Sequence, residues 1–425
     1  RATAPRTFGD PRWPAAFRQK GVRDPYYDAA RHMLGANPLP PQFNPNKLQA
    51  LQASAKYMGA KFERPPINVT FSDGENAAGV SQAACNMCGD CCSGCNYGAK
   101  NTTLMNYLPD AAKHGAVIVT EAEVLTVLPA DQGGWSVSIT DKSGKPGEPV
   151  TLTADMVVLG AGTLGSTEIL LRSAKAGLPV STKNLGAGFS GNGDVLAFGF
   201  DANWKHAKSA DERAPVYGIG AGKNVPSWDT PEFMPGPCIT GVIKVDMEPG
   251  KPGQKGLVIE EGVAPGALSM VYAAAFFMEE ALHGDLFRFP DAEMRLMDIK
   301  AIGETFQSGG GDLTAMAYDG PISRTQTFLL MSHDTSDGVT PYDDTLDHVT
   351  VSWPGVGGSA SYLHDNDMLR DACDGIWANY LENPMSLTPL GEKLVTVHPV
   401  GGCRMGDSGE TGVVSDLCAV FTGTG

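Results

Sequence analysis

Three glycines stand at a spacing that can bind a phosphate group. Gly160, Gly162 and Gly165 form G-x-G-x-x-G directly after the apolar run Met156–Leu159, at the point where a helical pattern begins. In such a strand–turn–helix unit, a pyrophosphate can approach the backbone N–H groups at the positive end of the helix. An autonomous dinucleotide-binding unit also needs an acidic residue about 20 residues later to hold a ribose. The chain instead enters a glycine-rich stretch, so the turn predicts either a phosphate site completed elsewhere or a simple packing turn.

A dense run of cysteines is the second feature that could carry chemistry. Five of the nine cysteines lie within eleven residues, and Cys85, Cys88, Cys91 and Cys95 have the C-x2-C-x2-C-x3-C spacing of iron–sulfur ligands. The proline that usually follows the last ligand is absent. Four of these thiolates could also hold a structural zinc ion, and thiols without metal, reduced or paired as disulfides, fit the run as well. All three states remain open.

Hydrophobic periodicity supplies the elements around these motifs. Buried or half-buried strands are expected where apolar residues alternate or cluster between turn residues, and helices where they recur with a period of 3.6. Strands are predicted over 116–120, 122–128, 135–139, 149–153, 156–159, 327–333 and 349–353, the last two as neighbours in one sheet, and helices over 24–34, 46–59 and 101–112.

Composition excludes several classes of function. The 425 residues are 42% hydrophobic and 19% charged, which is typical of a globular chain long enough for two or three domains. A formal net charge of −16 argues against nucleic acid or anionic lipid as the main partner, because both attract a basic surface. No apolar run of about 18 residues could span a bilayer. A small uncharged substrate is the partner that fits this chain, and its localisation stays open.

Four segments together resemble the glucose–methanol–choline (GMC) oxidoreductase family, nearest to the cholesterol oxidase group. They are Asn96–Leu104, Leu159–Ser173, Gly186–Gly193 and Val397–Gly406. Their order and rough spacing agree over residues of about 80 to 410. The resemblance implies FAD-dependent oxidation of an alcohol. It also implies a piece of a longer protein, because the first phosphate loop of that family and its C-terminal segment are not found here.

The resemblance implies a fold and a set of cofactor contacts. The expected fold class is α/β, α+β overall, with an incomplete Rossmann-like FAD-binding domain and an inserted domain of sheet and helices for the substrate. The expected domains are a lid segment at 1–75, an FAD-binding segment at 76–200 with the cysteine-rich loop 85–95, a substrate domain at 201–391, and a return to the FAD-binding domain at 392–425. Cofactor contacts are expected at Val124, Gly160, Ala161, Gly162, Gly165, Asn192, Gly193, Gly401 and Gly402.

His398 is the predicted catalytic base. Hydride leaves a carbinol carbon readily only if the hydroxyl proton leaves too, and a neutral imidazole with a pKa near working pH suits that proton. Pro399 keeps His398 out of helical geometry. In the family, the matching histidine faces the substrate hydroxyl and the flavin. Glu260 matches a substrate-side glutamate of the cholesterol oxidase group, with its neighbour Glu261 as the alternative.

The predicted function is therefore oxidation of a bulky, apolar alcohol, such as a sterol or a long-chain alcohol. The wall for such a substrate is expected among the apolar residues Ala273–Leu282, Leu296, Met297, Met316 and Leu329–Met331. The electron acceptor is either O2 or a redox carrier, and no motif decides between them. Two alternatives stay open: a dehydrogenase that passes electrons through an iron–sulfur cluster at Cys85–Cys95, and a non-catalytic electron-transfer or metal-binding component.

Overall fold

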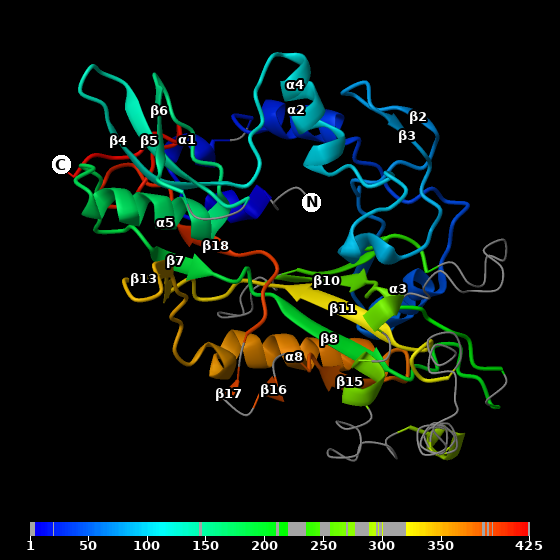
Figure 1. Ribbon diagram of the computed structural model, residues 1–425. Coiled ribbons are helices and arrows are strands. Elements are labelled where there is room, and N and C mark those ends of the chain that lie inside the picture. The colour runs from blue at the N-terminus through cyan, green and yellow to red at the C-terminus, as the bar shows by residue number, and fades with distance from the viewer. Residues whose placement is uncertain are drawn as a thin grey trace.

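The chain contains both helices and strands, which confirms the mixed fold class (Figure 1). The computed structural model describes residues 5–423, except 20, 144–146, 210–211, 220–234, 247–255, 269–270, 277–288, 295, 297–299, 301–319, 385–386, 389–390 and 393. Of the predicted substrate wall, Met297 and Met316 lie outside the described residues, and so do 277–282. Among the described residues, no helix combines the length and the apolar character needed to cross a membrane.

A six-stranded antiparallel sheet is the largest element of the fold. Its strand order is β1-β9-β10-β11-β8-β15. These strands are β1 (Lys61–Glu63), β9 (Val242–Val245), β10 (Leu257–Gly262), β11 (Gln326–Met331), β8 (Val195–Phe200) and β15 (Asn379–Glu382). Neighbours in the sheet are mostly far apart in the chain, so the sheet joins segments from the first 65 residues to the last 50.

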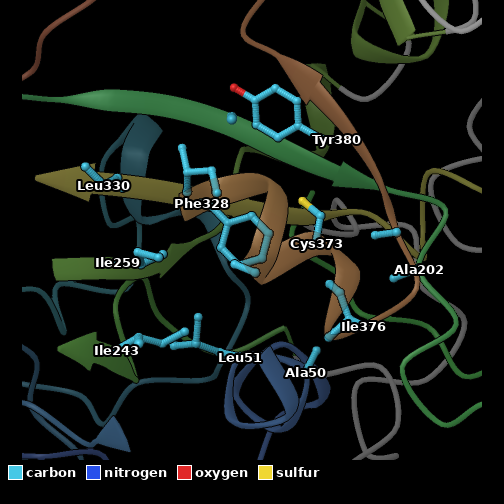
Figure 2. Close-up of a cluster of buried hydrophobic side chains, with 14 of the residues drawn as sticks. Ala50, Leu51, Ala202, Ile243, Ile259, Phe328, Leu330, Cys373, Ile376 and Tyr380 are labelled. Carbon is cyan, nitrogen blue, oxygen red and sulfur yellow. The ribbon is translucent and has the colours of Figure 1, made fainter. Parts of the chain in front are cut away.

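Helices α3 (Asn46–Tyr57) and α8 (Ala360–Asp374) cover one face of this sheet, and the main hydrophobic core lies between (Figure 2). Alternation along the strands selects the core residues, because successive side chains point to opposite faces. Ile259 of β10 and Phe328 and Leu330 of β11 are fully buried in this core. Helix α3 begins at the predicted residue, whereas α8 was not predicted; its end brings the buried Cys373 into the core.

In the part of the chain that the structure describes, side chains cover the opposite face of the sheet only in part. Phe198 and Phe200 of β8 pack there against Phe276, together with Ile219 and Leu381. Nearer the middle of the sheet, the side chains that alternate to this face include Leu196, Val258 and Met331, all partly exposed. An apolar surface therefore remains open beside the middle strands.

A three-stranded antiparallel meander forms a second sheet, separate from the six-stranded one. It consists of β4 (Ala122–Pro129), β5 (Trp135–Asp141) and β6 (Val150–Ala154), and helix α5 (Gly162–Lys175) packs on it. The prediction of strands over 122–128, 135–139 and 149–153 is confirmed. A smaller sheet of β12 (Gly338–Val339), β7 (Ala187–Ser190) and β18 (Val400–Gly402) touches α5 on the side toward the large sheet (Figure 1).

Two predicted strands, 116–120 and 156–159, are not formed. Both segments lack strand pairing, and they are open to solvent: Val117 is 88% exposed, Met156 78% and Val158 84%. A buried parallel strand needs a partner on each side, and no described residue supplies one. The prediction that 327–333 and 349–353 are adjacent strands is also wrong, because β11 pairs with β10 and β8 while β14 (His348–Val349) pairs with β13 (Tyr342–Asp343).

The remaining elements are short. Helix α2 matches its predicted bounds, and the predicted helix 101–112 is split into a 3-10 turn and α4. These remaining elements are the helices α1 (Ala15–Arg18), α2 (Asp24–Leu34) and α4 (Tyr107–Lys113), the 3-10 turns η1 (Pro5–Gly9), η2 (Asp90–Ser93), η3 (Thr103–Met105), η6 (Gly266–Leu268) and η9 (Val356–Gly358), and the strands β2 (Gly74–Glu75), β3 (Ser81–Gln82), β16 (Leu387–Thr388) and β17 (Gly391–Glu392).

Candidate active site

The imidazole of His398 is held by a buried carboxylate. Its Nδ1 lies 3.2 and 3.0 Å from the two carboxylate oxygens of Asp194, whose side chain is 1% exposed. The backbone N–H groups of Val397 and His398 donate to the same carboxylate, and so does the hydroxyl of Thr396. The histidine side chain itself is 43% exposed. Asp194 therefore fixes one edge of the ring and leaves the other edge open.

This contact decides where the imidazole carries its proton. An ionised carboxylate only accepts hydrogen bonds, so Nδ1 is the protonated nitrogen and Nε2 carries the lone pair of the neutral ring. The hydrogen bond that His398 donates to Asp194 raises the pKa of His398 above its usual value, although partial burial opposes the shift. The negative charge of Glu260 acts in the same direction. His398 can thus accept a proton at Nε2.

Strand alternation separates the two glutamates of β10. Glu261 points to the face covered by α3, where its carboxylate bonds to Lys47 Nζ, to Thr240 and to the backbone N–H of Gly241. Both Lys47 and Glu261 side chains are 0% exposed, and burial raises the pKa of Glu261 while Lys47 opposes that shift. Glu260 points to the opposite face, where its charge acts on His398. Of the two candidates, only Glu260 lies toward the histidine.

Glu260 stands in a row with apolar side chains of the neighbouring strands. It pairs across the sheet with Leu329 of β11, which pairs in turn with Leu196 of β8. Both leucines are partly exposed, whereas Glu260 is 3% exposed. A carboxylate beside open apolar surface suits a ligand that is mostly apolar with one polar group.

The glycine turn at the start of α5 lies close to the histidine segment. Thr163 Oγ1 donates to the carbonyl of Pro399 at 2.8 Å. Gly402 follows in β18, where an added Cβ would come within 2.1 Å of Thr167 Oγ1, so only glycine permits this approach of strand and helix. At Gly160 and Gly162, by contrast, an added Cβ would meet nothing within 4 Å. The front of the turn is therefore open, as a phosphate site requires.

The other predicted cofactor residues lie in the surrounding loops and strands. Gly165 is closely packed, with an added Cβ 2.9 Å from that of Ala161. Asn192 and Gly193 form the left-handed turn before Asp194, and the N–H of Gly193 donates to Asp334. Gly401 packs on the backbone of Gly188. Val124 lies in β4, which packs on α5, at an irregularity of the strand pairing.

The four predicted metal ligands are not gathered into a ligand set. In the part of the chain that the structure describes, no three or more His, Cys, Asp or Glu side chains are arranged to hold a metal ion. The thiol of Cys91 contacts Cys238 instead, and that contact together with burial raises its pKa. Cys85 is partly buried against the apolar cluster of Leu39, Leu48 and Met87. The cysteine run therefore does not fit a four-thiolate cluster in this arrangement.

Sequence reasoning missed two residues of this site. Asp194 stands 204 positions before His398, and its local pattern does not indicate a contact with that histidine. Thr163 was included only as one of the variable positions of the glycine motif. A polar residue that follows a glycine-rich turn and begins a buried strand was the available signal for Asp194, because such a carboxylate must find donors.

Comparison with known proteins gives the following matches. Residues 12–187 match the family model described as GMC oxidoreductase. A cholesterol oxidase of Mycobacterium tuberculosis is 30% identical over 194 residues, which are 42% of this chain and 34% of that protein. A cholesterol oxidase of Acinetobacter baumannii is 29% identical over 189 residues, 42% of this chain and 33% of that protein. The matched part thus spans about a third of the curated relatives.

A solved structure also resembles this chain. It is an FAD-dependent oxidoreductase from Chaetomium thermophilum in complex with a butanamide fragment, with 14% sequence identity and a TM-score of 0.45. The match covers 90% of this chain and 66% of that one.

Proposed function

We propose that the protein takes part in FAD-dependent oxidation of an alcohol to a carbonyl compound, because residues 12–187 match the family model described as GMC oxidoreductase. The observation that carries this proposal is the buried Asp194 behind an open His398, next to the glycine turn of α5. A proton acceptor and a phosphate-type turn within one site are what alcohol oxidation by a flavin demands.

The residues around the α5 turn fit the cofactor. Gly160, Ala161 and Gly162 would hold its pyrophosphate, since their backbone is open and lies at the positive end of a 14-residue helix. Asn192, Gly193, Gly401 and Gly402 would lie along the rest of the cofactor. A bound FAD would take the hydride from the carbinol carbon.

His398 Nε2 takes the hydroxyl proton in this proposal. The ring is anchored through Nδ1, so its free nitrogen keeps one direction, and Asp194 stabilises the imidazolium that forms. Glu260 adds a second negative charge near that cation. His398 and Glu260 can also transfer a proton to or from a substrate that is bound on the face of the sheet to which Glu260 points.

The substrate we propose is bulky and apolar, a sterol or a long-chain alcohol. The open apolar side chains beside Glu260, among them Leu196 and Leu329, support this proposal. The names of the two curated relatives favour a sterol. The electron acceptor is O2 or a redox carrier, and we propose no route through an iron–sulfur cluster, because the four thiols of the run are not brought together.

The test follows flavin reduction under anaerobic conditions. At saturating FAD, cholesterol or a long-chain alcohol should bleach the oxidised flavin, and His398→Ala should slow the step by about 10²–10⁴, the usual worth of a positioned base. His114→Ala is the matched control, since His114 is 76% exposed and contacts Asp110 at the end of α4. Equal rates in His398→Ala and wild type would remove His398 from the mechanism. Iron-dependent absorbance that bleaches with dithionite, without flavin, would favour the electron-transfer alternative.

A further inference from the structure

The cysteine-rich loop is docked on the segment that leads into the large sheet. The N–H of Gly236 donates to the carbonyl of Met87 at 3.0 Å. At Gly89 an added Cβ would come within 2.8 Å of the Pro235 ring and 3.1 Å of Val263, so the loop approaches as closely as a glycine allows. Residues 85–95 and 235–241, distant in the chain, therefore form one contact.

Two thiols face each other across this contact. Cys92 Sγ lies 3.5 Å from Cys238 Sγ, and the two sulfurs lie 3.4 and 3.5 Å from the carbonyl oxygen of Val263. A disulfide bond is about 2.05 Å long, so closing this pair needs a movement of about 1.5 Å. Cys92 is exposed on η2, whereas Cys238 is half-buried. The function proposed above uses neither thiol.

We propose that Cys92 and Cys238 are a redox pair that closes to an intramolecular disulfide. The oxidant is a disulfide of low molecular weight. The Cys92 thiolate attacks one of its sulfurs, which forms a mixed disulfide and releases one small thiol. Cys238 then gives up its proton to the second leaving group and attacks Cys92 Sγ, which releases the second small thiol. Two thiols of the protein are oxidised and one small disulfide is reduced.

The disulfide would restrain strand β10, which carries Glu260 and Glu261. Next to Cys238, the N–H of Ile239 donates to the backbone carbonyl of Glu261, and Thr240 holds the Glu261 carboxylate. A disulfide to the loop therefore restrains the segment that anchors β10, one residue from Glu260. This inference stands apart from the proposed function, because it needs neither FAD nor an alcohol.

Peptide mapping under non-reducing conditions tests the pair. The folded protein is treated with excess oxidised glutathione, alkylated and digested with trypsin, and the peptide that contains Cys238 is followed by mass spectrometry. We expect it to be linked to the loop peptide that ends at Lys100, and a thiol reductant should separate the two. All five loop cysteines fall in that one peptide, since the only Arg or Lys between Lys61 and Lys100 precedes Pro65.

Variants then identify the loop partner. Cys92→Ser and Cys238→Ser should each abolish the link, whereas Cys91→Ser and Cys418→Ser should keep it. Cys91 is the critical comparison, because its thiol also contacts Cys238, and Cys418 is an exposed cysteine elsewhere. Cys92→Ala repeats the test if the serine variant does not fold. A link that survives in Cys92→Ser, or wild-type protein whose Cys238 stays alkylated after oxidation, would overturn the proposal.

Discussion

The contact between Asp194 and His398 leaves Nε2 of the imidazole free. The same contact predicts how folding stability depends on pH. The hydrogen bond raises the pKa of His398, so the contact stabilises the protonated ring. Its contribution to folding stability is complete below the ordinary histidine pKa of about 6.5 and is lost as pH rises through the raised pKa.

Asp194→Asn keeps the shape of the side chain and removes its charge. We expect a lower pKa for His398, because the charge that favours the imidazolium is gone. The variant should lose more stability in acid than at neutral pH, and the acidic limb of any base-dependent rate should move to lower pH. Titration of the His398 ring protons by NMR measures the shift.

The matched control is Asp344→Asn, whose carboxylate is 83% exposed and bonds Lys175. This change should leave the His398 titration as in the wild type. An unchanged His398 titration in Asp194→Asn would show that the carboxylate does not tune the ring.

Single residues also mark the limit of what the sequence could predict about the site. His398 was predicted from its Pro and Gly neighbours together with the family resemblance. Asp194 was not found, since its contact with the ring depends on the fold that brings residues 194 and 398 together. The choice between Glu260 and Glu261 needed the strand register, because a shift of one residue exchanges the two faces of the sheet.

Helix α3 is attached to the sheet by a buried ion pair. Lys47 Nζ donates to Glu261, to the carbonyl of Pro237 at 2.8 Å and to Thr240 Oγ1 at 3.3 Å, so its three protons are all used. Both side chains are fully buried. Removing one partner of such a pair leaves an uncompensated charge in the interior.

Lys47→Met should therefore lower the free energy of unfolding by about 3–5 kcal/mol, measured by urea denaturation. Adding Glu261→Gln to this variant should recover part of the loss, since the orphaned charge is then removed. Lys244→Met is the control: Lys244 pairs with Glu63 at the partly exposed edge of the sheet, where a pair is worth about 0–1 kcal/mol. Equal losses for Lys47→Met and Lys244→Met would contradict the argument.

Elements with their own local pattern were predicted well, and elements that depend on distant partners were not. The meander β4–β6 and helix α2 follow from alternation and periodicity within a few residues. The runs 116–120 and 156–159 have the composition of buried strands, yet they are unpaired and exposed. Whether an apolar run becomes a strand depends on a neighbour that its own sequence does not contain.

These two exposed runs bear on cofactor binding by the molecule as a whole. The segment 156–159 leads into the glycine turn, and a phosphate turn is held in place by the sheet behind it. Because none of the described residues forms such a sheet with 156–159, we expect the 425-residue chain to bind FAD more weakly than micromolar in a fluorescence titration. Micromolar or tighter binding would show that the turn and the segments around His398 suffice.

The strand order of the large sheet also determines when the molecule can fold on the ribosome. Strand β8 has β11 and β15 as its neighbours, and residues 201–378 lie between the end of β8 and the start of β15. At about 5–20 residues per second, translation of that interval takes about 10–40 s. Throughout it Phe198 and Phe200 lack β15, and β11 is added only late in the interval, so their apolar side chains are available to chaperones until the sheet is complete.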